Sequence, residues 1–245
     1  MGPRGPSPPL VTDAAGSRTI PFRTVSRYRL VMRIGFAFLV VSVMLSGCID
    51  RPNRQRPRLV ASAVVGTDPA ALRQCIGRLD HMVARYQLLP DRNFGGQCDA
   101  LGAVKLLDIG TPVANLGAMT CRLGEAFTRW VQNDLQASAQ KFLSSRVVKV
   151  ESMGTYACRN VNGAASGKLS EHAHANAVDV SAFMLADGRR LSVQDWWFTD
   201  GEAAQFLRAV RAAGCNRFST VLSPDYNAAH HDHLHFDLGG KPFCR

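Results

Sequence analysis

The chain has 245 residues, of which 46% are hydrophobic and 20% charged, a composition typical of a globular protein and not of a disordered one. Its formal net charge is +10, but ten arginines and only two aspartates fall within residues 1–58. The remaining 187 residues carry 19 basic and 17 acidic side chains. A nucleic-acid surface needs a basic face on the folded domain, so this distribution argues against nucleic acid as a partner.

The N-terminal region has the features of an export signal. Four arginines precede the uncharged twelve-residue run 34–45, which has the length of a signal-peptide core and is too short to span a bilayer as a helix. The run ends in LSGC, which resembles a bacterial lipobox with Cys48 as the lipidated first residue of the mature protein. A buried helix or an uncleaved anchor is the alternative. We expect residues 1–47 to be the signal region, with the true start of translation at Met32.

A short tether is expected between the lipid and the folded part. Residues 48–60 are polar and rich in proline and arginine, which indicates a flexible segment, and the domain is expected over 61–245. Ile49 follows the cysteine in place of an aspartate, which resembles outer-membrane sorting. The expected location is therefore the bacterial cell envelope, lipid-anchored at the outer membrane and facing the periplasm, with membrane contact through the lipid alone.

The cysteines support export. An even set of six remains after Cys48 is set aside, and in an exported chain this predicts three disulfides, with free buried thiols as the alternative. No CxxC spacing occurs, which argues against a zinc knuckle. We favour one pair, Cys215 with Cys244, because it would tie the last segment to the body. The other candidates are Cys75, Cys98, Cys121 and Cys158.

The first half of the domain is predicted to be mainly helical. A helix is predicted from residue 69 to about residue 86, because Asp68 suits the N-cap, Pro69 suits the first turn, and apolar residues recur at helical spacing to Met82. The elements predicted next are a strand over 102–110, a helix over 121–143 and a strand over 145–158.

The second half is predicted to be mainly strands. Residues 176–183 and 190–193 flank an Asp-Gly turn and form a hairpin, and residues 201–214 form a helix that ends at a glycine. Two further strands are expected over 219–223 and 233–238. The order predicts an α+β fold, with a small, mostly antiparallel sheet flanked by helices and no internal repeat.

Six of the seven histidines fall in two short windows, SEHAHANAVDVSAF (170–183) and AAHHDHLHFD (228–237). His172 and Asp179 would lie roughly 23 Å apart on a continuous strand and about 10 Å apart on a helix. They meet on one ion only if the chain folds back, with His172 in a loop and Asp179 on the following strand. A third ligand must come from the second window. Two imidazoles and a carboxylate with an open fourth position are typical of catalytic zinc, and solvated surface histidines are the alternative.

The two windows also resemble a known signature. SEHAHANAVDVSAF resembles the S-x-H-x-x-G-x-A-x-D-V motif of the zinc D-Ala-D-Ala peptidases related to Hedgehog signalling domains, and HDHLHFD resembles their closing H-x-H element. With GTYACR, DGRRLSV, VLSPDYNAAHHDHLHFDLG and the final CR, they are similar to the extensin-like C-terminal domain family of bacterial exported proteins, over about residues 72–245. The resemblance implies a Hedgehog/D-Ala-D-Ala-peptidase-like fold and Zn²⁺ held by His172, Asp179 and His235.

The same resemblance implies roles for residues beside the ligands. Arg159 resembles the arginine that binds the terminal carboxylate of the substrate, and Ser170 resembles a serine beside the site; a surface arginine and an ordinary loop cap are the alternatives. In one branch of these peptidases the general base is a glutamate three residues before the last ligand, a spacing that Asp232 occupies here with a shorter side chain. In the other branch it is the first histidine of H-x-H, here His233. On an ideal strand His233 shares a face with His235 and Asp232 points away, which favours His233 unless the strand starts after Asp232.

At four further positions the sequence departs from the signature or has a histidine that the signature does not explain. Ala175 stands where the signature has a glycine, and a positive φ there would cost about 1 kcal/mol. His174, His230 and His231 match no ligand position and are expected at the rim of the site.

The resemblance therefore implies an exported lipoprotein that is a zinc metallopeptidase, either a carboxypeptidase or an endopeptidase, with peptidoglycan stem peptides as its partners. The alternative is a non-catalytic cell-wall-binding or envelope scaffold protein that retains a structural metal site. A third interpretation is a periplasmic metal-handling protein.

Overall fold

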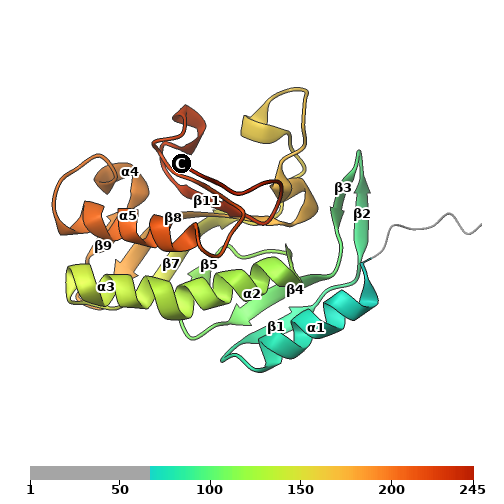
Figure 1. The fold of residues 1–245 in the computed structure, drawn as a ribbon, viewed down its shortest axis with the longest axis horizontal. Coiled ribbons are helices and arrows are strands. Elements are labelled where there is room, and N and C mark those ends of the chain that lie inside the picture. Colours follow the sequence, from blue (N-terminus) through green and yellow to red (C-terminus); the bar gives the residue numbers. More distant parts are fainter. Residues whose placement is uncertain (1–66) are drawn as a thin grey trace, which may run out of the picture. The chain divides into compact units, whose positions relative to one another are not determined.

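The computed structural model describes residues 67–245, and the predicted signal region, Cys48 and the tether lie outside this range (Figure 1). The helices are α1 (Pro69–Asp80), α2 (Cys121–Arg129), α3 (Gln136–Leu143), α4 (Val193–Trp196) and α5 (Glu202–Gly214). The π-helical turn Trp130–Leu135 joins α2 to α3, which confirms the continuous helix predicted over 121–143. Within residues 67–245, no helix is both long and apolar enough to cross a membrane.

The strands form three sheets. Their bounds are β1 (Arg85–Leu88), β2 (Arg92–Gly95), β3 (Cys98–Ala100), β4 (Ala103–Asp108), β5 (Val113–Ala114), β6 (Met119–Thr120), β7 (Val147–Gly154), β8 (Ala177–Leu185), β9 (Arg190–Ser192), β10 (Thr220–Leu222), β11 (Leu234–Asp237) and β12 (Phe243–Cys244). The main sheet has seven strands in the order β12-β10-β11-β8-β7-β5, with β9 paired to β8. A three-stranded sheet β1-β4-β6 and the hairpin β2–β3 complete the fold.

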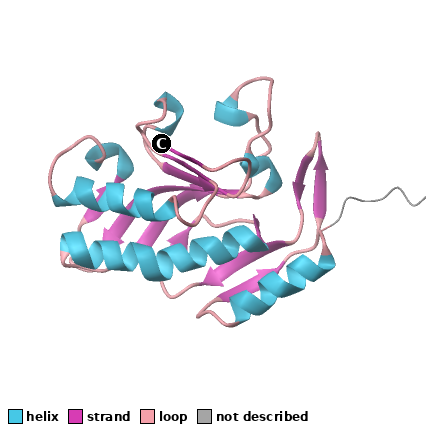
Figure 2. Ribbon diagram, in the orientation of Figure 1, coloured by secondary structure: helices cyan, strands magenta, loops and turns pink. Residues whose placement is uncertain are grey.

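The mixed α+β class and the mostly antiparallel pairing are confirmed (Figure 2). In the main sheet only β5–β7 and β10–β12 are parallel pairs. This sheet is larger than predicted, because the two-residue strands β5 and β12 also join it by backbone hydrogen bonds. Two-residue strands are too short to produce a periodic pattern in the sequence.

The core lies between the main sheet and the helices. The continuous α2–α3 helix and α5 lie side by side across one face of this sheet (Figure 1). The fully buried Trp130 lies between them, where its indole N–H donates to the Val210 carbonyl (3.0 Å). Its ring contacts Phe183 of β8 and Phe236 of β11. The helix layer therefore covers this face of β8 and β11, and the opposite face is left for the histidine windows.

The first predicted helix is too long. Helix α1 ends at Asp80, and Arg85–Leu88 form strand β1, which pairs antiparallel with β4. The helical spacing of apolar residues continues to Met82, but pairing with a distant strand decides the conformation of the residues that follow. The hairpin β2–β3 is absent from the sequence prediction, whereas the β8–β9 hairpin, α5, β10 and β11 occur close to their predicted positions.

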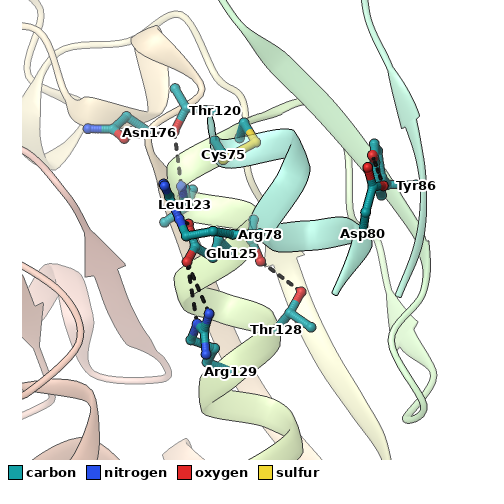
Figure 3. Close-up of a disulfide and its surroundings, with 12 residues drawn as sticks. Cys75, Arg78, Asp80, Tyr86, Thr120, Leu123, Glu125, Thr128, Arg129 and Asn176 are labelled. Carbon is teal, nitrogen blue, oxygen red and sulfur yellow. Dashed lines mark hydrogen bonds and ion pairs between the residues drawn. A yellow bond between two sulfur atoms is a disulfide. The ribbon is translucent and has the colours of Figure 1, made fainter. Parts of the chain in front are cut away.

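All six candidate cysteines form disulfides: Cys75–Cys121, Cys98–Cys158 and Cys215–Cys244. The predicted pair Cys215–Cys244, here called the C-terminal disulfide, is confirmed. Figure 3 shows the first disulfide, where Cys75 joins α1 to the start of α2. Close by, Glu125 accepts hydrogen bonds from Arg78 and Arg129. Three disulfides indicate an oxidising compartment outside the cytoplasm.

Candidate metal centre

The two histidine windows, residues 170–183 and 228–237, lie side by side in the fold. Strands β8 and β11 are antiparallel, and Asp179 lies directly opposite His235 in their register. Before β8, Ser170 starts a short 3₁₀ turn (Glu171–His174), and its hydroxyl accepts the His172 N–H at 3.3 Å. The chain then reverses into β8. His172 therefore lies in a turn and Asp179 on the next strand, the arrangement that their spacing requires for a common ion.

The reversal depends on Ala175. This residue is left-handed, with φ of 50° and ψ of 28°, at the position where the peptidase signature that the sequence resembles has a glycine. A left-handed alanine costs about 1 kcal/mol relative to glycine. Its side chain is fully buried against Ala100 and Ala103, and burying one methyl contributes about 0.8 kcal/mol. The substitution therefore preserves the turn, because burial of the methyl group offsets most of the strain.

The three predicted ligands converge on one point. His172 Nε2 lies 3.0 Å from Asp179 Oδ2 and 3.3 Å from His235 Nδ1. His235 Nδ1 lies 2.8 Å from Asp179 Oδ1. All three side chains are buried, and their ligand atoms lie within 4.8 Å of one another. This group can hold a metal ion.

The far sides of the two imidazole rings determine which nitrogen atoms are available as ligands. His172 Nδ1 donates to the Thr155 carbonyl (2.8 Å), and His235 Nε2 donates to the Asp237 carboxylate (2.9 Å). Because both partners only accept, the ring hydrogens of the neutral tautomers lie on these far sides. Two nitrogen lone pairs and the Asp179 carboxylate therefore face one another with no donor between them. Three converging acceptors fit a divalent cation, with the carbonyl and the second carboxylate orienting the rings.

The pKa values of the cluster also favour a bound positive charge. When protons rather than a cation lie between the three groups, burial raises the pKa of Asp179, but hydrogen bonds from the His172 and His235 rings outweigh this effect and hold that pKa well below its usual range. Burial lowers the pKa of His235, whereas its hydrogen bonds to Asp179 and Asp237 raise it to about 9. The pocket therefore stabilises positive charge, either as protons on the imidazole rings or as a bound cation.

Both candidates for the general base lie beside this cluster. His233 precedes β11 and is buried, with its Nε2 3.6 Å from Asp179 Oδ1. Its Nδ1 lies 2.8 Å from Asp232 Oδ1, so the Asp232 carboxylate accepts the ring hydrogen. His233 therefore faces the cluster, on the same side as His235, although the strand starts only after it. Asp232 orients the His233 ring.

The substrate-binding candidates also lie here. A guanidinium nitrogen of Arg159 is 3.6 Å from Asp179 Oδ2, and the Arg159 side chain is 39% exposed, so it reaches both the cluster and solvent. Ser170 caps the turn that carries His172, which is the structural role considered as its alternative. A cavity of about 600 Å³ adjoins His233 and His235, and both Arg159 and Ser170 line it.

The three unmatched histidines occupy different environments. His231 is exposed, and half-buried His174 pairs with Asp99 at 3.3 Å, so neither joins the cluster. The prediction for His230 is wrong, because it is buried and its ring centre lies 5.8 Å from that of His235. Burial, with a smaller contribution from the neighbouring His233 and His235 rings, lowers the pKa of His230 to about 4. The buried ring is therefore neutral.

Two residues of the site are missing from the sequence prediction. Asp237 stands two residues after His235, a spacing that places both on one face of a strand, so its role was detectable. Thr155 contributes only a backbone carbonyl, for which no side-chain signal exists.

The fold and the site together define a disulfide-bonded α+β domain with a buried His₂Asp group that can hold a metal ion. A family model described as the C-terminus of extensin-like proteins matches residues 73–245. The chain therefore belongs to the extensin-like C-terminal domain family. No curated protein and no solved structure gives a match to the chain.

Proposed function

We propose that this protein is a zinc-dependent peptidase that acts on peptidoglycan stem peptides, as a carboxypeptidase or an endopeptidase. The observation that carries the proposal is the convergence of His172, Asp179 and His235, with both imidazole N–H groups held on the far sides of the rings. The likeness of both histidine windows to the zinc D-Ala-D-Ala peptidases related to Hedgehog domains supports this choice of reaction.

The donor set favours zinc. Two imidazole nitrogens and one carboxylate resemble catalytic zinc shells, which use three protein ligands and keep one position open. A bound zinc ion supplies Lewis-acid chemistry, polarising an amide carbonyl and making water more acidic. Thr155 and Asp237 keep the ligand lone pairs aimed at the ion.

The neighbouring residues account for proton transfer and substrate binding. With its Nδ1 hydrogen donated to Asp232, His233 carries a lone pair on Nε2 at the edge of the cluster. In this proposal Nε2 accepts the proton of the attacking water and passes it to the leaving amine. The Arg159 guanidinium binds a carboxylate of the peptide by charge-assisted hydrogen bonds.

The location follows from the same proposal. Export through the N-terminal signal region and lipidation of Cys48 would hold the domain at the outer membrane, facing the periplasm. Residues 48–60 would act as a tether within reach of the wall. Disulfide formation in the domain is consistent with this oxidising compartment.

Metal analysis and digestion of purified muropeptides test this function. We expect the purified protein to carry about one zinc ion and to shorten or cleave stem peptides, and chelation to abolish the activity. His235→Ala should lose both properties with an unchanged circular dichroism spectrum. The matched control is His81→Ala, because His81 is exposed and outside the site.

Three outcomes would contradict the proposal. A wild-type protein that binds no divalent metal at neutral pH would remove its basis. Binding to the wall that survives His235→Ala, with no product from any muropeptide, would instead indicate a scaffold protein. Rapid exchange of weakly bound zinc without hydrolysis would indicate metal handling.

A further inference from the structure

The cavity beside the candidate metal centre has an aromatic end. Tyr226 and Phe243 both line it and are 42% and 43% exposed. Their rings meet edge to face with centres 5.6 Å apart, and we call this pair the aromatic shelf. A pair of partly exposed rings inside a cavity is a feature of ligand-binding surfaces.

The aromatic shelf is fixed in place on both sides. The Phe243 N–H donates to the Ser219 carbonyl (2.8 Å), and the next residue belongs to the C-terminal disulfide. The Tyr226 N–H donates to the Ser223 carbonyl (2.9 Å), and its ring contacts that of His230. Because the rings are already ordered, a ligand that covers them loses little conformational entropy to the protein.

The polar groups around the aromatic shelf decide which ligand it fits. Among the described residues the Tyr226 hydroxyl has no hydrogen-bond partner. The side chain therefore offers a ligand both an apolar ring face and a hydroxyl group that is free to form a hydrogen bond. Lys168 and Lys241 line the same cavity, and neither forms an ion pair or a side-chain hydrogen bond within residues 67–245. A pyranose ring matches this surface, because it has an apolar C–H face bordered by hydroxyl and acyl oxygens. An aliphatic side chain would cover the rings but could accept no hydrogen bond from these exposed polar groups.

We propose that the aromatic shelf binds a sugar ring of the wall, so that the substrate is a stem peptide still attached to its amino sugar. The inference deepens the proposed function and rests on it. Ring centres are 5.5 Å apart from Tyr226 to His230 and 5.8 Å apart from His230 to His235. Placed end to end, these two distances correspond to roughly three residues of extended peptide. Adding the 5.6 Å from Phe243 to Tyr226 brings the length to roughly five residues. Because such a sum is the longest separation these distances allow, the bond attacked lies at most about five residues from the sugar.

Two substrates with the same peptide test the inference. One is a disaccharide-linked pentapeptide and the other is the free pentapeptide. We expect the wild-type KM to be about ten-fold lower for the linked substrate, because two aromatic contacts are gained. Tyr226→Ala and Phe243→Ala should abolish this difference while leaving the free peptide unaffected. Phe243→Tyr should retain the preference, and Phe198→Ala is the matched control, since Phe198 is 72% exposed and outside the cavity.

Three results would overturn the inference. The wild type would process both substrates equally, the two alanine variants would retain the preference, or they would lose activity on both substrates alike while remaining folded. Calorimetric titration with an N-acetylglucosamine tetramer separates this inference from the proposed function. If neither peptide is cleaved, binding that Tyr226→Ala abolishes still supports the aromatic shelf. Without cleavage, a lack of tetramer binding overturns it.

Discussion

The hydrogen bond between His235 and Asp237 gives the sharpest test of the metal centre. The two side chains are buried and meet at 2.9 Å, and Asp237 also accepts the Gly239 N–H at 2.8 Å. Asp237→Asn keeps the shape of the side chain but replaces a charged acceptor by an amide. An amide oxygen makes the ring nitrogen less basic. An amide nitrogen facing the ring would instead move the ring hydrogen to Nδ1, where it blocks the ligand atom.

The expected effect is a large loss of metal affinity with little change in fold. Removing the partner of a ligand imidazole costs about 10- to 100-fold in affinity, or about 1.4–2.7 kcal/mol. Competition with a chromophoric zinc chelator at neutral pH measures it directly. Asp200→Asn is the matched control, because Asp200 is exposed and its side chain forms no hydrogen bond or ion pair within residues 67–245. An affinity within two-fold of the wild type, in a variant of unchanged unfolding free energy, would refute the assignment of the tautomers.

Three further predictions concern stability. Gly214→Ala should lower the unfolding free energy by about 1–3 kcal/mol in urea denaturation, because the new Cβ would lie 2.6 Å from the Phe236 ring. At Gly77 an added Cβ would have no atom within 4 Å, so Gly77→Ala should raise the unfolding free energy by about 0.5–1 kcal/mol. An equal effect of the two substitutions would contradict the close contact between Gly214 and Phe236. The Tyr86 hydroxyl donates to Asp80, which raises the pKa of Tyr86 to about 12. The hydrogen bond from Tyr86 to Asp80 therefore contributes fully to the stability of the fold below pH 10.0, the ordinary pKa of tyrosine. This contribution is lost as the pH rises through about 12, the pKa in the folded protein. In an ultraviolet titration, Tyr86→Phe should remove a phenolate ionisation near pH 12. Loss of an ionisation near pH 10.0 instead would disprove the hydrogen bond. Replacing both cysteines of the C-terminal disulfide by serine should cost about 3.6 kcal/mol for a sequence separation of 29, whereas no loss would show that the bond adds little constraint.

Elements encoded by local periodicity were predictable from the sequence. The continuous helix over 121–143, helix α5 and the β8–β9 hairpin each carry a pattern within a few turns of chain. Strand β1 shows the limit of this reasoning. Its residues come directly after a helical pattern that continues to Met82, but their hydrogen bonds go to β4, about twenty residues later. A pairing between distant segments leaves no trace in local spacing.

The candidate ligands were also predictable in part. Metal chemistry and the seven-residue spacing pointed to His172 and Asp179 on a chain that folds back, and the resemblance to the peptidase signature singled out His235 in the second window. What the sequence left open was the environment of each group. Only the tertiary structure places His230 in the interior, gives His172 a carbonyl partner from Thr155, and sets Asp232 behind His233. Burial and hydrogen-bond partners depend on where separate loops meet. The sequence therefore determined which residues can bind a metal, and the fold determined which of their atoms face the ion and how these are charged and shielded from water.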